Sequence, residues 1–293
     1  MGVTGTIRRE LARRAPKLDD RLQETTWRRR NRDRGTGAQP PTQLRGVVER
    51  LRTDGVVITD ADTVFGDGAL FDAAAARARE LYERPREEVA AEAGSKSTFL
   101  TKLIEGPLEF DDPFVRLVLH PNALAVANAY LRMRSTLRAI DLWLTQPTAG
   151  DAVQTQLWHR DADDVMNVKM FVYFTDVRRE AGPLCYAPNT HPLGTRRRVP
   201  EHDEQGRSDD AQLEQVAPRE EWILCEGKPG TVVFADTCGY HKQLKPETDE
   251  RLLLVSHYVS GTPFVPSTLD LRGVEESSLT DDQYVAVFDR LRH

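Results

Sequence analysis

The spacing of apolar positions changes about 130 residues into the chain. Before that point, the Ala-, Glu- and Arg-rich residues 67–92 predict a helix. A second helical stretch is expected from about Asp112 to Arg132, interrupted or restarted at Pro121. Ahead of both, LRTDGVVITD (51–60) predicts a helix end, a turn at Asp54-Gly55 and a buried strand. The first 130 residues are therefore expected to be mostly helical.

After this point the chain consists of short β-branched or aromatic runs bounded by Gly, Pro, Asp or Asn. The runs are TLRAIDLWLTQP, VQTQLWHRD, NVKMFVYFTDV, GPLCYAP, WILCEG, GTVVFADTC and RLLLVSHYVSG. Several short strands separated by turns predict an antiparallel sandwich or barrel. Near the C-terminus, SLTDDQYVAVFDRL predicts a short helix capped at Thr280.

Two segments interrupt this order. Residues 35–42 (GTGAQPPT) have the composition of a linker, and the 34 residues before them carry eleven Lys or Arg against five Asp or Glu. We therefore expect a basic arm and linker over 1–42 and one catalytic domain over 43–293. The polar stretch 194–220 is too long for an ordinary hairpin, which predicts a disordered insert or a lid over a site.

Composition narrows the function further. Apolar residues make up 39% of the 293 residues and charged residues 29%, which is enough for a core and a polar surface. The net charge of −6 argues against general nucleic-acid binding. No apolar run is long enough for a membrane span, and the N-terminus lacks the apolar stretch of a secretory signal, so we expect a cytoplasmic protein. Its three cysteines have no CxxC spacing. We expect a small molecule as the binding partner. The oligomeric state stays open.

Metal-binding residue types follow two of the predicted strands. His159 and Asp161 are one residue apart after the alternating run VQTQLW, so both side chains are expected on one face. His241 follows the strand GTVVFAD and a tight turn, and has the best context for a third ligand. Two His and one carboxylate leave half of an octahedral metal open, as iron oxygenases require. Arg251, ten residues further on, has the fixed charge needed to hold a carboxylate of 2-oxoglutarate.

In this order, WHRD, KMFVYFTDV, GPLCYAPNTH, His241 and Arg251 resemble the phytanoyl-CoA dioxygenase family over roughly residues 140–260. The resemblance implies a double-stranded β-helix (jelly roll) flanked by N-terminal helices, an α+β fold with a mainly β core. It also implies iron(II) on His159, Asp161 and His241, with 2-oxoglutarate on Arg251 and O2 as the oxidant. The family's usual PGSH is PNTH here (188–191), and Asn can adopt the left-handed turn that Gly normally supplies.

The resemblance implies hydroxylation as the default reaction, with desaturation, epoxidation and oxidative cyclisation on the same metal ligands still open. Halogenating relatives replace the carboxylate ligand, which Asp161 retains. The substrate is expected to be a small polar metabolite, with a saccharide or a specialised-metabolite intermediate favoured. Two other classes compete: a non-catalytic jelly roll that binds a ligand, and an oxygen-independent, cupin-like metalloenzyme.

Two further polar residues are candidates for the co-substrate. Gln156 lies three residues before His159 and could bond 2-oxoglutarate or simply be a polar residue at the barrel rim. Lys169 alternates onto one face of the next strand, where it contacts co-substrate or substrate, or is exposed.

Four residues are candidates for the substrate pocket. Trp158 is either pocket wall or packing behind the ligands, and Tyr173 shares a face with Lys169. Lys96 lies in a polar stretch that could line the entrance. His257 shares strand parity with Arg251, so it is a rival metal ligand, although a hydrogen-bonded core or pocket histidine is favoured.

Overall fold

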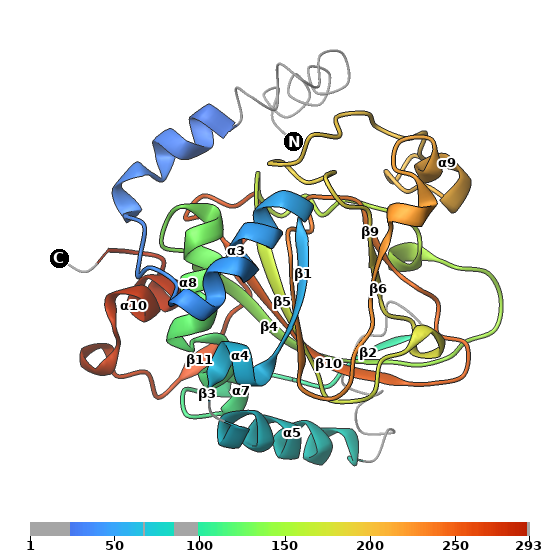
Figure 1. Ribbon diagram of the computed structural model, residues 1–293. Helices are drawn as coiled ribbons and strands as arrows, with labels where there is room; N and C mark the ends of the chain where they lie inside the picture. Colours follow the sequence, from blue (N-terminus) through green and yellow to red (C-terminus); the bar gives the residue numbers. More distant parts are fainter. Residues whose placement is uncertain (1–23, 67, 85–98, 292–293) are drawn as a thin grey trace.

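The computed structural model describes residues 24–66, 68–84 and 99–291. A six-stranded antiparallel sheet in the order β1-β8-β5-β10-β4-β2 lies at its centre (Figure 1). A three-stranded antiparallel sheet, β7-β6-β9, faces it, and two short strands, β3 and β11, pair in parallel. The strands are Val56–Asp60 (β1), Leu100–Lys102 (β2), Leu108–Glu109 (β3), Thr136–Thr145 (β4), Val168–Tyr173 (β5), Leu184–Tyr186 (β6), Ile223–Cys225 (β7), Thr231–Ala235 (β8), His241–Gln243 (β9), Arg251–Val259 (β10) and Leu271–Arg272 (β11).

Most helices lie on one side of the large sheet (Figure 1). They are Thr42–Asp54 (α3), Ala61–Phe65 (α4), Gly68–Tyr82 (α5), Pro113–Val118 (α7), Pro121–Leu131 (α8) and Asp281–Phe288 (α10), while Asp210–Glu214 (α9) lies apart from them. Because side chains alternate along a strand, even-numbered residues of the central strands, such as Leu142, Met170 and Leu254, pack in the core under the helices. Odd-numbered residues, such as Tyr173 and Leu253, face the three-stranded sheet instead. The predicted helix-flanked double-stranded β-helix is confirmed.

Several local predictions are confirmed as well. Helix α7 ends at Val118 and α8 begins at Pro121, with His120 as its N-cap. Gly55 has φ 85° between α3 and β1, as the Asp54-Gly55 turn predicts. The side chain of Thr280 caps α10. In each case a turn or cap residue marks the boundary of the element.

The predicted strand over VQTQLWHRD is wrong. Gln154–Gln156 form a short 3-10 helix, because Gln154 has φ 52° and the Gln156 side chain accepts a hydrogen bond from the Val153 N–H. Beyond it, Trp158 and His159 make isolated bridges to Ser208 and His241. The side-chain parity expected across residues 153–161 is therefore broken at the 3-10 turn.

The two unusual segments are partly ordered against the domain. Residues 24–30 are helical, and the buried Trp27 donates from Nε1 to Asp164 Oδ1 at 2.9 Å. In the stretch 194–220, Leu213 and Ala217 are buried beside Trp158, so this stretch packs on the domain. No helix in the described part of the chain has the length and apolarity to span a membrane.

Candidate metal and co-substrate site

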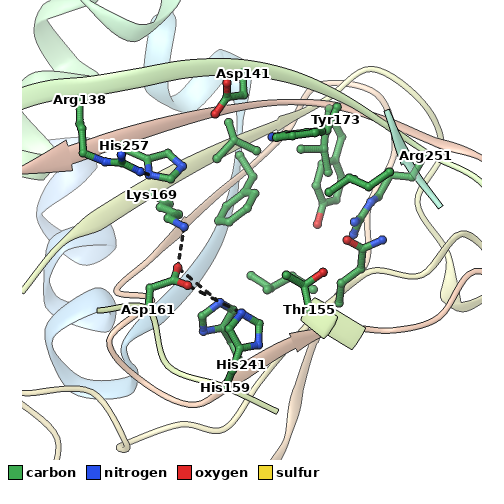
Figure 2. Close-up of a pocket in the computed structure, with 17 residues that line it drawn as sticks. Arg138, Asp141, Thr155, His159, Asp161, Lys169, Tyr173, His241, Arg251 and His257 are labelled. Atoms are coloured by element: carbon green, nitrogen blue, oxygen red, sulfur yellow. Dashed lines mark hydrogen bonds and ion pairs between the residues drawn. The ribbon is translucent and has the colours of Figure 1, made fainter. Parts of the chain in front are cut away.

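A cavity opens between the two sheets, and the histidines and carboxylate singled out above line it (Figure 2). His159, Asp161 and His241 offer three ligand atoms within 4.8 Å of one another. The Nε2 atoms of His159 and His241 each lie 3.7 Å from an Asp161 carboxylate oxygen. Sequence positions 80 residues apart are brought together by this arrangement, as the spacing of the motifs predicts.

Backbone hydrogen bonds hold the three side chains in place. His159 and His241 exchange N–H to carbonyl bonds of 3.0 Å in both directions, and the Asp161 N–H donates to the Thr237 carbonyl at 2.8 Å. The turn before His241 is fixed by Asp236, which accepts from the Cys238 N–H at 2.9 Å and from the Tyr130 hydroxyl at 2.6 Å. The turn at 188–191 also forms as expected, with Asn189 at φ 65°.

The tautomers of both histidines suit metal binding. His159 Nδ1 lies 2.9 Å from the Leu157 carbonyl, and His241 Nδ1 lies 3.0 Å from the Gly239 carbonyl. A carbonyl only accepts, so both Nδ1 atoms carry the proton and both Nε2 lone pairs point at the site. Burial lowers the pKa of His241 to about 3 and also lowers the pKa of His159, so both rings are neutral at pH 7.

Asp161 remains ionised for a different reason. Burial alone would raise its pKa, but the Lys169 ammonium and the two histidines outweigh burial and hold the pKa well below its usual range. Lys169 Nζ donates to Asp161 Oδ2 at 2.5 Å (Figure 2). Two neutral imidazoles and one carboxylate with three open positions form the donor set that suits iron(II), so the residues present fit this metal.

Arg251 lies at the opposite end of the cavity from Lys169 (Figure 2). It is buried, and burial lowers its pKa to about 10, so it remains a cation at pH 7. Its Nη2 lies 3.4 Å from Thr145 Oγ1, and its Nε has no hydrogen-bond partner in the described part of the chain. A buried guanidinium without a carboxylate partner among the described residues has unused donors that suit the carboxylate of a ligand.

Two polar residues of the cavity wall were missed by sequence reasoning. Thr155 and Gln243 line the cavity, and Thr155 Oγ1 and Gln243 Nε2 are buried without hydrogen-bond partners among the described residues. Gln243 could have been found, because it lies two residues after His241 on the same face of β9. Thr155 could not, because the 3-10 turn decides its direction.

The same turn changes the placement of two sequence candidates. Gln156 does not line the cavity, since its Oε1 caps Val153 and its Nε2 is buried without a partner among the described residues. Trp158 is fully buried behind the site, edge-on to Trp222 with ring centroids 4.6 Å apart. Trp158 therefore belongs to the packing behind the ligands and not to the pocket wall.

The other candidates fall on the cavity wall or outside the described residues. Tyr173 lines the cavity, and its hydroxyl donates to the Cys225 carbonyl at 2.7 Å. His257 lines the cavity too, but it is absent from the cluster of three ligand atoms. Lys96 lies outside the described residues.

Behind the metal ligands, the stretch 194–220 holds both ligand-bearing segments. Ser208 exchanges backbone hydrogen bonds of 2.9 and 3.0 Å with Trp158, the residue before His159. Asp210 Oδ1 accepts from Trp158 Nε1 at 2.7 Å and from Lys242 Nζ, the residue after His241. No described residue of 194–220 lines the cavity, so a role as lid stays a prediction.

Solved structures with similar folds are oxygenases and related enzymes. The epimerase SnoN, in complex with Fe3+, alpha ketoglutarate and nogalamycin RO, is 20% identical, with a TM-score of 0.55 over 80% of this chain and 92% of its own. The non-heme monooxygenase ThoJ is 18% identical, with a TM-score of 0.52 over 75% and 80%. EctD from S. alaskensis is 17% identical, with a TM-score of 0.51 over 77% and 84%. No curated protein matches the sequence significantly.

The family model described as phytanoyl-CoA dioxygenase (PhyH) matches residues 51–244, about two thirds of the chain. The matched range includes His159, Asp161 and His241, and the fold and donor set agree with it. The chain belongs to the phytanoyl-CoA dioxygenase family, and it is an oxygenase that depends on iron(II), 2-oxoglutarate and O2.

Proposed function

We propose that this oxygenase holds iron(II) with His159, Asp161 and His241, holds 2-oxoglutarate with Arg251, and oxidatively tailors a small polar metabolite. The observation that carries the proposal is the pairing of two incomplete groups across one cavity. One is a set of three metal donors, and the other is a buried guanidinium without a carboxylate partner among the described residues. Together they match a molecule that chelates a metal at one end and carries a carboxylate at the other.

The residues around Arg251 orient this co-substrate. The guanidinium binds the distal carboxylate through two parallel N–H bonds, and Thr155 and Gln243 supply the polar groups beside it. Tyr173 and Leu253 form an apolar wall next to Arg251, because they pair with each other in the β5–β10 register. This wall excludes water from the distal carboxylate and strengthens each electrostatic contact there.

Lys169 acts on the metal side of the cavity. Its ammonium occupies Asp161 Oδ2, which leaves Oδ1 for the metal and favours a carboxylate bound through one oxygen. Lys169 was a candidate for contact with co-substrate or substrate, and we now favour this orienting role, because the side chain points to Asp161 (Figure 2). When bound, iron(II) and 2-oxoglutarate would activate O2, the oxidant that takes two electrons from 2-oxoglutarate and two from a substrate C–H bond.

Hydroxylation is the favoured outcome, with desaturation or cyclisation available to the same site. The retained Asp161 carboxylate argues against halogenation, since a halide needs that metal position. We favour a saccharide or a specialised-metabolite intermediate as substrate. In support of this, the SnoN structure, which shares the fold, contains nogalamycin RO.

Succinate formation tests the proposal directly. The purified protein with iron(II), 2-oxoglutarate and O2 should form succinate, and Asp161→Ala should abolish it. Turnover that persists without O2 would instead support an oxygen-independent metalloenzyme. Absence of both succinate and 2-oxoglutarate binding would support a non-catalytic ligand-binding jelly roll.

A further inference from the structure

The cavity has a second polar end, which the metal and the co-substrate leave unused. His257 follows Arg251 by six positions on β10, so their backbones lie roughly 20 Å apart at about 3.3 Å per residue. The carbon chain of 2-oxoglutarate has four C–C bonds, one more than the backbone of a single extended residue. It therefore spans about 5 Å. The region around His257 is therefore free for another molecule.

A β-bulge builds this second end. The β10–β4 register shifts between His257, which pairs with Ala139, and Tyr258, which pairs with Leu137, so Arg138 is the extra residue on β4. A bulge reverses the alternation of side chains, and Arg138 consequently lines the cavity beside His257 although Ile140 packs under the helices. Figure 2 shows Arg138, His257 and Asp141 gathered at this end.

The charges at this end are already paired. Arg138 Nη2 lies 3.4 Å from Asp163 Oδ2, and Lys102 Nζ lies 2.5 Å from Asp141 Oδ1. Lys169 is paired with Asp161. Lys169 Nζ also lies 4.0 Å from Asp163 Oδ2. Among the described residues these three cations are balanced by three carboxylates, so a charged ligand group would leave one partially buried charge without its counterpart.

His257 adds a neutral donor. Its Nδ1 lies 3.1 Å from Arg138 Nη2, which can only donate, and 3.7 Å from Asp163 Oδ2, which is beyond hydrogen-bond range. Nδ1 therefore accepts, and the proton is on Nε2, for which no hydrogen bond is found among the described residues. Burial, followed by the nearby Lys169 charge, lowers the pKa of His257 to about 4, in agreement with a neutral ring at pH 7.

Asp141 supplies an acceptor close to this donor. Lys102 bonds its Oδ1, and Oδ2 has no hydrogen bond among the described residues. Asp141 pairs with Val255 and His257 with Ala139, so Asp141 and His257 are diagonal neighbours on adjacent strands, roughly 7 Å apart. Phe171, the β5 partner of Val255, adds an aromatic wall to this part of the cavity.

We propose that Asp141, His257 and Arg138 form the substrate subsite of this oxygenase, and that it binds an uncharged, hydroxyl-bearing ring. A hydroxyl group accepts from His257 Nε2–H and donates to Asp141 Oδ2, and the ring packs on Phe171. Arg138 is the positioning residue that fixes the histidine tautomer. The inference rests on the proposed function, because it assigns the other end of the cavity to 2-oxoglutarate.

Three probes on one scaffold test the inference: phenyl glucoside, which is uncharged, phenyl glucuronide, which carries one carboxylate, and phenyl glucosaminide, which carries one ammonium. Binding is measured by calorimetry on protein loaded with Zn(II) and saturating 2-oxoglutarate. The glucoside should bind about tenfold more tightly than either charged probe. Tighter binding of a charged probe, or no binding of the glucoside, would overturn the inference.

The variant Asp141→Asn adds a signature that a structural role would not produce. It removes the acceptor charge and leaves the Lys102 ammonium unpaired, so glucoside binding should weaken by about tenfold while glucuronide gains relative to it. His257→Gln should weaken the glucoside similarly without that change of preference. The exposed Asp72→Asn serves as the matched control and should change neither. An unchanged ratio of glucoside to glucuronide affinity in Asp141→Asn would contradict the assignment.

Calorimetric titration of 2-oxoglutarate into the same Zn(II) protein separates the two claims. If 2-oxoglutarate binds and the glucoside does not, only the substrate inference fails. If 2-oxoglutarate does not bind, the proposed function fails, and the division of the cavity fails with it.

Discussion

Replacing Arg251 by methionine separates a ligand-binding role from a structural one. Arg251 is buried, and within the described residues it has no carboxylate partner and only a 3.4 Å contact to Thr145. The lowering of its pKa by burial from 12.5 to about 10 corresponds to roughly 3 kcal/mol of cost for the buried charge. Methionine has a similar shape and no charge, so the metal-free, co-substrate-free variant should unfold with equal or higher free energy than wild type.

Co-substrate binding should respond in the opposite direction. Losing one partner of a buried, hydrogen-bonded charge pair costs about 2–5 kcal/mol, which corresponds to a loss of 2-oxoglutarate affinity of about 30-fold to several thousand-fold. At a concentration 100 times the wild-type Kd, 2-oxoglutarate stabilises wild type by about 2.7 kcal/mol. At the same concentration the variant should gain less than about 1 kcal/mol.

Denaturant unfolding with and without 2-oxoglutarate, on Zn(II)-loaded protein, measures both effects. The exposed Arg178, paired with Asp176 at 2.9 Å, provides the control Arg178→Met, which should change neither quantity. The reasoning is refuted if Arg251→Met keeps wild-type affinity for 2-oxoglutarate. It is refuted equally if the ligand-free variant loses more than about 2 kcal/mol of stability, since Arg251 would then support the fold itself.

Three other predictions follow from particular contacts. Asp210→Ala removes the acceptor shared by Trp158 and Lys242, so metal affinity in a Co(II) titration should fall by about tenfold, and unchanged affinity would show that this contact does not position the ligands. Lys169→Met removes the charge that lowers the Asp161 pKa. In an acid titration the variant should therefore release its metal at a higher pH than wild type, and an identical pH profile would contradict the pairing. Burial lowers the pKa of His191 to about 4, below its unfolded value of about 6.5. The contribution of the neutral His191 ring to the unfolding free energy is therefore fully present above pH 6.5 and is lost as the pH falls towards 4. In metal-free protein, His191→Gln should therefore reduce the acid-induced loss by up to about 3 kcal/mol in denaturant titrations at pH 7 and pH 4.5, and an equal loss in both proteins would argue against this origin.

The alternation of side chains along β10 could be predicted from the sequence, and it placed Arg251 and His257 on one cavity wall. This worked because the strand is central and regular from Arg251 to His257. Boundaries set by local chemistry, such as the Thr280 cap, were equally accessible. The fold followed from these regular segments, whereas the regular strand expected before His159 did not form.

The side-chain alternation expected from the sequence was wrong at two places, where one residue interrupts a regular strand. At the 3-10 turn Gln154–Gln156, Thr155 lines the cavity wall and Gln156 does not. The Gln156 side chain accepts a hydrogen bond from the nearby Val153 N–H, which competes with strand pairing. The bulge at Arg138 likewise reversed the alternation within a strand that reads as regular. The bulge depends on pairing with β10, over 100 residues away, which the local pattern does not contain.

The central claim is that His159, Asp161 and His241 hold the iron that oxidises substrate with 2-oxoglutarate. Its most direct test is succinate formation by wild type and Asp161→Ala with iron(II), O2 and saturating 2-oxoglutarate, with the exposed Asp72→Ala as control. The account predicts succinate from wild type and from the control, and none above background from Asp161→Ala. Equal succinate formation by Asp161→Ala and wild type would contradict it.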